Sequence, residues 1–304
     1  MEFLYFLEGI RVPVLDKLML LITMLGEETA FLAIGILIFW CVDKYHGYYF
    51  MGVGLCGNLV NQFLKITCRV PRPWVKDPGF HALEEAVPAA GGYSFPSGHS
   101  QTAVGTFGAI FVTQKNKIFR AVCVAFMVLV PFSRMYVGVH TPADVLVGSA
   151  MALLLVAVFY PLMLCRKRNI PYVFGALLAL SAAYLMYVEQ YPFPENVDVH
   201  NLESAIKNGY TFLGCFAGFL VVYFVDEKKL HFSTKAIWWA QLIKAVLGLA
   251  LVLAVKEGLR PVLEAVLPVM PARAVRYFIV VLVAGIVWPM TFRWFAGLGR
   301  KGSR

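Results

Sequence analysis

The sequence is poor in charged residues, which make up 15% of the chain, whereas about a quarter of a soluble domain is charged. Apolar residues make up 60%, and several apolar runs reach the ~17–25 residues that a helix needs to cross a bilayer. These runs are continuous rather than alternating, which excludes a transmembrane β-barrel as well as a soluble fold. We therefore expect an all-α protein, a polytopic bundle of helices that bond their backbone groups within each membrane-spanning segment.

Cysteine is also scarce, and the six cysteines form no CxxC pair and no Cys/His spacing of a metal site. Five of them lie in or at the ends of apolar runs, and only Cys68 lies in an expected loop. This pattern argues against a disulfide framework and against a structural zinc site. The N-terminal stretch lacks the basic start and small-residue cleavage site of a secretory signal, so we expect none there.

A separate basic domain is missing, although the chain carries a formal net charge of +9. We therefore expect no nucleic-acid partner. The basic residues instead form four clusters between or after apolar runs, as they do in the cytoplasmic loops of membrane proteins. The clusters are Lys115, Lys117 and Arg120; Arg166, Lys167 and Arg168; Lys228, Lys229 and Lys235; and Arg293, Arg300, Lys301 and Arg304.

Nine apolar segments are expected to span the membrane. They are 28–42, 46–66, 98–114, 118–134, 142–164, 171–188, 209–226, 236–255 and 274–295. With this count all four basic clusters lie on one face, which the charge rule makes cytoplasmic. The loops 67–97 and 189–208 and the N-terminus then lie outside, and the C-terminus lies inside. Gly214 and Gly218 could let a neighbouring helix pack closely, although ordinary glycine frequency in membrane helices explains them equally well.

The N-terminal segment mixes apolar residues with Glu8, Arg11, Asp16 and Lys17. We expect an interfacial or re-entrant helix over 1–26. The alternative is one long span over 18–42, which would bury Glu27 and Glu28 near its middle at high cost. The expected domains are an N-terminal segment 1–27, a membrane core 28–190, and additional C-terminal spans 191–304.

The first polar segment among these runs is Lys65-Ile-Thr-Cys-Arg-Val-Pro-Arg72-Pro73, at the end of the second span. Pro71 and Pro73 interrupt the helix, so a stiff extended turn should hold Arg72. Two interpretations stay open for Lys65 and Arg72. They either snorkel toward lipid headgroups, as cations at helix ends do, or bind an anion.

The second segment, Phe95-Pro96-Ser97-Gly98-His99-Ser100, opens the third span. Ser97 occupies a natural N-cap position, and the free N–H groups of a helix N-terminus form an anion site. Gly98 lets a phosphate approach the backbone closely, and His99 could donate a proton to a leaving oxygen. The alternative is a capping serine followed by an interfacial histidine.

The third segment runs from Ser133-Arg134 to His140-Thr-Pro-Ala-Asp144. A threonine, a proline and an acid three residues after the threonine predict a helix start at Thr141. Asp144 can then reach the imidazole of His140 and fix its tautomer, which leaves the other ring nitrogen free as a nucleophile. Simple capping is the alternative role of Asp144, and both roles can hold at once.

All these residues fall on the outer side in the nine-span layout. Arg134 closes the fourth span there and can clamp phosphate oxygens in a bidentate manner. Three cations and a helix N-terminus suit a phosphoryl group, whose transfer depends on positioning and charge neutralisation. The sequence therefore predicts a phosphate site built from Lys65, Arg72, Ser97, Gly98, His99, Arg134, His140 and Asp144.

Lys65-x6-Arg72-Pro73, Pro96-Ser97-Gly98-His99 and Ser133-Arg134-x5-His140-x3-Asp144 resemble the tripartite signature of the type 2 phosphatidic acid phosphatase superfamily. The resemblance implies a six-helix phosphatase core, here with about three extra C-terminal spans, and no metal ion or cofactor. It implies that His140 is the nucleophile, that Asp144 orients it and that His99 protonates the leaving group. Lys65, Arg72, Ser97, Gly98 and Arg134 would then bind the substrate phosphate.

The resemblance covers residues 65–144 and leaves the substrate open. A lipid phosphate is the leading expectation: phosphatidate, a sphingoid-base phosphate, or a polyprenyl phosphate or diphosphate. A sugar-phosphate phosphatase similar to glucose-6-phosphatase and a lipid phosphotransferase are the alternatives. The vanadium haloperoxidases share the signature but are soluble, and a transporter or scaffold would not need His99, His140 and Asp144. Membrane lipids are the other expected partners, and the sequence does not indicate an oligomeric state.

Overall fold

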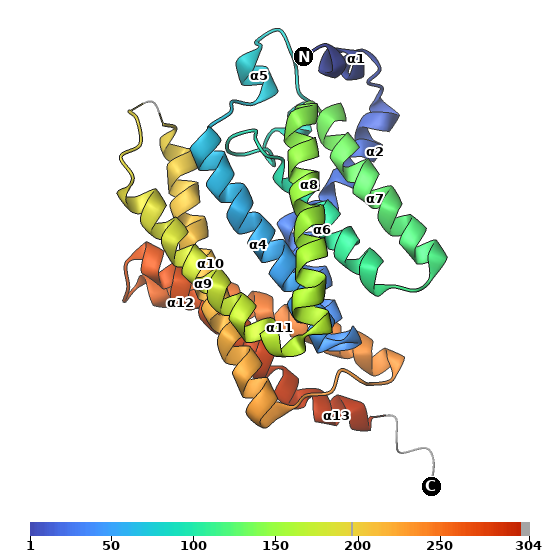
Figure 1. The fold of residues 1–304 in the computed structure, drawn as a ribbon, viewed down its shortest axis with the longest axis vertical. Helices are drawn as coiled ribbons and strands as arrows, with labels where there is room; N and C mark the ends of the chain where they lie inside the picture. The colour runs from blue at the N-terminus through green and yellow to red at the C-terminus, as the bar shows by residue number, and fades with distance from the viewer. Residues whose placement is uncertain (196, 299–304) are drawn as a thin grey trace. The chain divides into compact units, whose positions relative to one another are not determined.

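The computed structural model describes residues 1–195 and 197–298, and all the regular structure in these ranges is helical (Figure 1). The all-α expectation is therefore confirmed. The α-helices are α1 (Glu2–Gly9), α2 (Pro13–Met24), α3 (Glu28–Leu37), α4 (Lys44–Cys68), α5 (Pro73–Lys76), α6 (Gly98–Thr113), α7 (Lys117–Tyr136), α8 (Pro142–Phe159), α9 (Ile170–Gln190), α10 (Val199–Val225), α11 (Trp238–Glu264), α12 (Val269–Leu282) and α13 (Phe292–Gly297). Short π-helical segments lie at Ile38–Val42, Tyr160–Cys165, Asp226–Leu230 and Val283–Val287, and 3-10 turns at Glu84–Ala86, Lys167–Asn169 and Pro289–Thr291.

The number of spans differs from the expected nine. Within the described ranges, six helices are long and apolar enough to cross a membrane: Lys117–Tyr136, Pro142–Cys165, Lys167–Gln190, Val199–Leu230, Trp238–Glu264 and Val269–Gly297. A bent pair, α2 with Glu28–Val42, makes a seventh if it is one span. Two expected spans are helical but fall short. Helix α6 has only 16 residues, and Asn58, Asn61, Gln62 and Lys65 keep the hydropathy of α4 below that of the six.

The N-terminal segment is a broken helix rather than a straight one. Helices α2 and α3 meet at an angle of 50°, and Glu27 lies at the break between them. One long span over 18–42 is therefore possible only as a broken one, because the helix ends before Glu27 and resumes at Glu28. A broken span and a re-entrant loop both fit this geometry.

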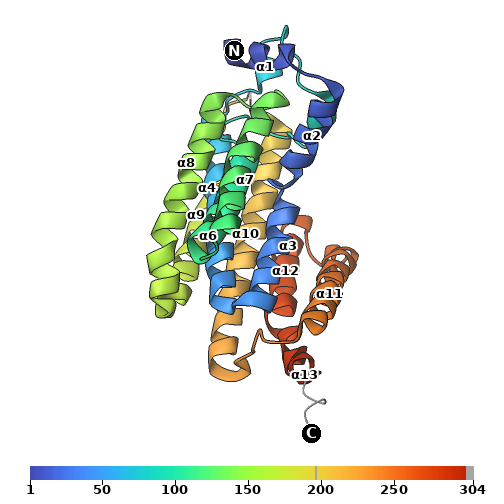
Figure 2. The ribbon, with the colours of Figure 1, turned by 90° about the vertical axis from the view of Figure 1, so that its right-hand side faces the viewer.

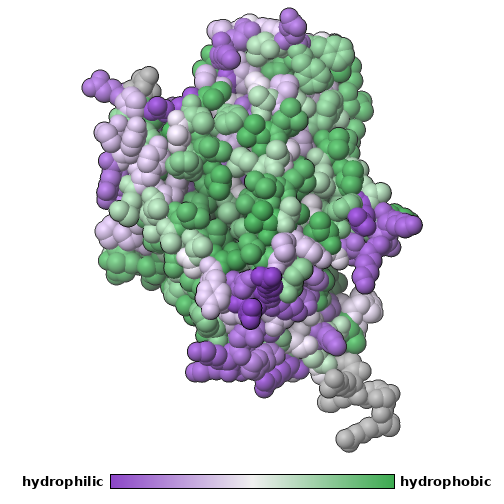
Figure 3. Space-filling model, viewed as in Figure 1, coloured by the Kyte–Doolittle hydropathy of each residue, from purple (hydrophilic) through white to green (hydrophobic). Residues whose placement is uncertain are grey.

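The chain folds into two compact units that interleave along the sequence. The first comprises residues 1–32, 50–160 and 193–205, and the second comprises 33–49, 161–192 and 206–304. The division into 1–27, 28–190 and 191–304 stays a prediction. Of the fourth basic cluster, Arg300, Lys301 and Arg304 lie outside the described residues. The face drawn in Figure 3 is largely apolar between hydrophilic margins.

In the first unit, α6 packs against both α7 and α8, and α2 packs against α7 (Figures 1 and 2). Phe107 of α6 stacks on Phe126 of α7 with ring centroids 4.9 Å apart. The approach of α8 to the start of α6 requires a glycine, because a Cβ on Gly148 would lie 2.6 Å from the carbonyl oxygen of Ser97. This packing places the N-terminus of α6 beside the first turns of α8.

The second unit has an aromatic core in which Phe174 of α9 stacks on Phe219 of α10 with ring centroids 5.0 Å apart. Helices α10 and α12 pack very closely. A Cβ on Gly214 would lie 2.2 Å from the carbonyl oxygen of Ala274, and one on Gly218 would lie 2.8 Å from the Cβ of Val281. The two glycines therefore serve close helix packing, which decides between the two interpretations of their spacing.

Candidate active site

The eight residues predicted to bind and transfer phosphate all lie in the first compact unit. They come from the ends of four helices and from the segments beside them. Lys65 is in the last turn of α4, Ser97 caps α6, Arg134 is in the last turn of α7, and Asp144 is in the first turn of α8. Residues 79 positions apart in the sequence thus enter one region, because the helices present their polar ends together.

His140 is buried between Arg72 and Asp144. Its Nε2 lies 2.9 Å from Nη1 of Arg72, and its Nδ1 lies 3.5 Å from Oδ2 of Asp144. A guanidinium can only donate hydrogen bonds, so Nε2 accepts and the proton of the neutral ring is on Nδ1, facing the carboxylate. The lone pair of His140 therefore lies on Nε2, on the side away from Asp144.

The carboxylate of Asp144 is held by its own helix cap and by a serine. Its Oδ2 accepts hydrogen bonds from the backbone N–H of Thr141 at 2.8 Å and from Oγ of Ser94 at 2.6 Å. The backbone N–H of Asp144 in turn donates to Oγ1 of Thr141 at 3.3 Å. This reciprocal pair confirms the predicted capping box. The same carboxylate caps α8 and faces His140.

Arg72 lies in an extended turn, with φ −65° and ψ 155°, as its two flanking prolines predict. Its guanidinium donates to the carbonyl oxygens of Gly91, Gly92 and Val139 at 2.8–2.9 Å, in addition to its contact with His140. Four of its five N–H groups are thus engaged. The loop carbonyls fix the orientation of this cation against the imidazole, which snorkelling toward headgroups would not do.

The N-terminus of α6 has the geometry expected of its motif. Oγ of Ser97 accepts from the backbone N–H of Ser100 at 3.3 Å and shares a 2.8 Å hydrogen bond with Oγ of Ser100. The backbone N–H of Ser97 donates to the carbonyl oxygen of Asp144 at 2.9 Å, which ties α6 to α8. A Cβ on Gly98 would come no closer than 3.6 Å to Oδ1 of Asn61, so the first helical residue leaves room beside the backbone.

Three side chains at the site keep buried polar atoms without hydrogen-bond partners among the described residues. They are Arg134, at Nε and Nη2, His99, at Nε2, and His140, at Nδ1, which lies 3.5 Å from the carboxylate of Asp144. Arg134 is fully buried, and its one hydrogen bond runs from Nη1 to Oγ1 of Thr23 at 2.8 Å. Buried polar groups are nearly always hydrogen-bonded, so these unpaired atoms have the capacity to bind a ligand. The oxygens of a phosphate group could accept hydrogen bonds from the guanidinium of Arg134 and the imidazole of His99.

Lys65 donates from Nζ to the carbonyl oxygen of Tyr93. The charges of Lys65, Arg72 and Arg134 all act on His140. Burial, followed by the charge of Arg72, holds the pKa of His140 well below its ordinary value. Burial also lowers the pKa of Arg72, to about 10, although the carboxylate of Asp144 opposes the shift. At neutral pH the imidazole is therefore uncharged and the guanidinium is charged.

Sequence analysis missed two side chains that hold this arrangement, Thr23 and Ser94. Ser94 lies two residues before Pro96-Ser97-Gly98-His99, and its position beside a motif was a signal that could have found it. Thr23 lies in the apolar helix α2, far from every motif in the sequence. The break after α2 also approaches the site closely, because a Cβ on Gly26 would lie 2.9 Å from the carbonyl oxygen of His99.

Comparison with known proteins decides the family. Residues 45–168 match the PAP2 superfamily, and residues 210–301 match the transmembrane extension of PAP2 superfamily phosphatases. Phosphatidylglycerophosphatase B of Bacillus subtilis (strain 168) is 30% identical over 161 residues, which cover 48% of this chain and 74% of that protein. The chain belongs to the PAP2 superfamily. It is a membrane lipid phosphatase of that superfamily with a C-terminal transmembrane extension.

Two further curated proteins are similar to this PAP2 phosphatase. Undecaprenyl-diphosphatase BcrC of Bacillus subtilis (strain 168) is 29% identical over 153 residues, covering 48% of this chain and 74% of that protein. Sphingosine-1-phosphate phosphatase 2 of Homo sapiens is 27% identical over 143 residues, covering 45% of this chain and 35% of that protein. No solved structure matches the chain.

Proposed function

We propose that this PAP2 phosphatase hydrolyses the terminal phosphate of a lipid phosphate through a phosphohistidine on Nε2 of His140. The observation that carries the proposal is the arrangement of the buried imidazole, with Nε2 toward the cations and Nδ1 toward Asp144. Nε2 attacks phosphorus and the bond from phosphorus to the leaving oxygen breaks. His99 supplies the proton that the leaving oxygen takes up.

In the second half of the reaction, His99 takes a proton from water, and the hydroxyl oxygen attacks the phosphorus held on His140. The bond between phosphorus and Nε2 breaks, which releases inorganic phosphate and restores the neutral ring. Asp144 keeps the proton on Nδ1 and stabilises the positive ring formed during the first attack. Lys65, Arg72, Arg134 and the N-terminus of α6 neutralise the phosphoryl oxygens, so the mechanism uses no metal ion.

The substrate class is a phosphate monoester or diphosphate carried on a lipid. Relatives named for undecaprenyl diphosphate, phosphatidylglycerophosphate and sphingosine 1-phosphate support this class, since all three place a terminal phosphate on a membrane-anchored tail. The charged loops between the spans support an active site on the extracytoplasmic face and a cytoplasmic C-terminus. A panel of these lipids and glucose 6-phosphate, assayed in mixed micelles, identifies the preferred substrate.

The decisive experiment compares purified wild type with His140→Ala, using a lipid whose terminal phosphate is radiolabelled. Wild type should release phosphate and, after an alkaline quench, carry label on the protein. His140→Ala should do neither, with turnover lowered by about 10⁴-fold or more. His200→Ala is the matched control, because His200 is exposed at the start of α10. Equal release by wild type and His140→Ala would refute the mechanism.

Two further measurements test whether the reaction needs a metal ion and whether water is the phosphate acceptor. Activity should survive EDTA, and a complete loss that added metal restores would contradict the metal-free mechanism. Label recovered on a lipid acceptor instead of inorganic phosphate would make the enzyme a phosphotransferase that uses the same intermediate.

A further inference from the structure

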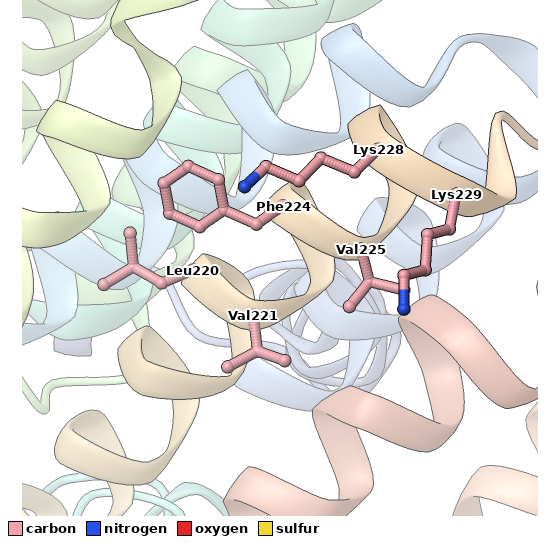
Figure 4. A pocket seen from close by; sticks show the side chains of 6 residues that line it. All are labelled: Leu220, Val221, Phe224, Val225, Lys228 and Lys229. Carbon is pink, nitrogen blue, oxygen red and sulfur yellow. The ribbon is translucent and has the colours of Figure 1, made fainter.

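A hollow of about 280 Å³ lies on one face of α10, at the end that continues into the π-helical segment Asp226–Leu230 (Figure 4). It is lined by Leu220, Val221, Phe224, Val225, Lys228 and Lys229. They form three adjacent pairs, and each pair begins four residues after the one before it. This spacing places all six along one face of the helix. All of them belong to the second compact unit, whereas the phosphatase site belongs to the first.

The lining changes character along the helix. The first two pairs are apolar, and Val221 and Phe224 are exposed. The last pair is two exposed lysines. Nζ of Lys228 lies 5.8 Å from the centroid of the Phe224 ring, and Figure 4 shows the two side chains lying alongside each other while Lys229 lies beside Val225. The hollow thus has an apolar length and a cationic end.

The neighbouring acids do not neutralise this cationic end, because they are engaged elsewhere in the second unit. Oδ2 of Asp226 lies 2.5 Å from Nζ of Lys44, and its Oδ1 accepts from the backbone N–H of Phe232 at 3.0 Å. Glu227 accepts from the hydroxyl of Tyr45 at 2.8 Å. Neither Lys228 nor Lys229 forms an ion pair with the described part of the chain.

We propose that this hollow binds one anionic membrane phospholipid. Its phosphate lies between the ammonium groups of Lys228 and Lys229, and one acyl chain lies along Leu220, Val221, Phe224 and Val225. Charge complementarity selects the anionic headgroup. The apolar part of the hollow lies on a membrane-spanning helix, Val199–Leu230, so an acyl chain reaches it from the bilayer. Free phosphate would make no use of that apolar length.

The test is native mass spectrometry of the full-length protein, titrated with dioleoyl phosphatidylglycerol or dioleoyl phosphatidylcholine. Wild type should bind the anionic lipid at least tenfold more tightly than the zwitterionic one. Lys228→Gln combined with Lys229→Gln should weaken phosphatidylglycerol binding about 25-fold, because each lysine near an anionic headgroup contributes about fivefold. Phosphatase turnover in phosphatidylcholine micelles should not change.

The matched control is Lys115→Gln combined with Lys117→Gln, which removes the same charge from exposed lysines of another basic cluster. That variant should bind phosphatidylglycerol as wild type does. Phe224→Ala should weaken binding about threefold or more, and Phe119→Ala, which alters another exposed phenylalanine, should not. Equal losses from both lysine pairs would show a diffuse basic surface and overturn the proposal. Equal binding of the two lipids would overturn it as well.

Discussion

Among the described residues, each compact unit has one cationic side chain that is completely buried, and the two differ in their hydrogen bonds. Lys244 of the second unit donates from Nζ to the carbonyl oxygens of Trp40 at 2.9 Å and Thr234 at 3.1 Å, and it lies 4.4 Å from the ring centroid of Phe292. Arg134 of the first unit has one hydrogen bond, to Thr23, and its Nε and Nη2 have no partner in the described residues. Both side chains are 0% exposed.

The two units also differ in how a buried aspartate is held. Asp226 of the second unit is in direct contact with Lys44, whereas Asp144 faces His140 at 3.5 Å and is held mainly by Ser94 and Thr141. A buried charge costs several kcal/mol unless hydrogen bonds or a counter-ion offset it. In the second unit, contacts within the protein offset this cost. The first unit leaves part of it uncompensated within the described residues, and the proposed substrate phosphate would offset that part.

The largest effect that this comparison predicts is on turnover. Asp144→Asn should lower kcat by about 10³–10⁴-fold, since the amide can no longer hold the proton on Nδ1 or stabilise the cationic ring. KM should change little, because the phosphate is held by other groups. Steady-state kinetics on a lipid phosphate measures both constants.

Asp226→Asn is the control for that substitution. It breaks an ion pair in the second unit and should lower the Tm while leaving kcat per folded molecule unchanged. A parallel fall in kcat and 1/KM for Asp144→Asn would argue against its orienting role.

The second prediction sets Arg134→Gln against Lys244→Met. Arg134→Gln should lower kcat/KM by about 10²–10³-fold, as loss of one donor to a transition-state oxyanion does. Its Tm should hold or rise, because a buried cation with unpaired donors is removed. Lys244→Met should instead lower the Tm, since it removes the side-chain donor to the carbonyl oxygen of Trp40, whereas that of Thr234 keeps Nε2 of Gln241 at 2.8 Å. Steady-state kinetics and thermal unfolding of both purified variants test these expectations.

A Tm loss for Arg134→Gln as large as that for Lys244→Met would remove the distinction between the two cations.

The predicted and the missed features of the site differ in how local their signals are. The caps at Ser97 and Thr141 and the extended turn at Arg72 depend on neighbours within a few residues, so the sequence predicts them correctly. The hydrogen bond from Arg134 to Thr23 joins residues 111 positions apart, and no local pattern indicates it. The span count differs for a related reason. Asn61 and Lys65 of α4 donate to the carbonyl oxygens of Pro96 and Tyr93 beside the site, and these long-range contacts cannot be read from the apolar runs.

The third prediction concerns pH. Because burial and Arg72 lower the pKa of His140, the nucleophile stays unprotonated as the pH falls through 6.5, the ordinary value for histidine. The acidic limb that His140 contributes to kcat/KM should therefore lie below that value. Arg72→Gln removes a neighbouring cation, so it should raise the pKa of His140 and move the limb to higher pH. The substrate phosphate titrates identically in assays of wild type and Arg72→Gln, so it does not contribute to the difference between their pH profiles. A limb that stays in place would show that the charge of Arg72 does not set this pKa.

The smallest effect tests how far the first unit depends on its N-terminal segment. Thr23→Val removes the acceptor for Nη1 of Arg134 while keeping the shape of the side chain. A buried charged donor loses about 1–2 kcal/mol when its acceptor is removed, and most of that loss should fall on the positioning of Arg134. We expect kcat/KM to fall about fivefold, chiefly through a higher KM. Adding Arg134→Lys to Thr23→Val should not restore kcat/KM. Thr29→Val is the matched control, because Thr29 is exposed and bonds only to Glu27. If both threonine variants behaved as wild type, α2 would pack beside the site without positioning it, and the unpaired atoms of Arg134 alone would define the contrast with Lys244.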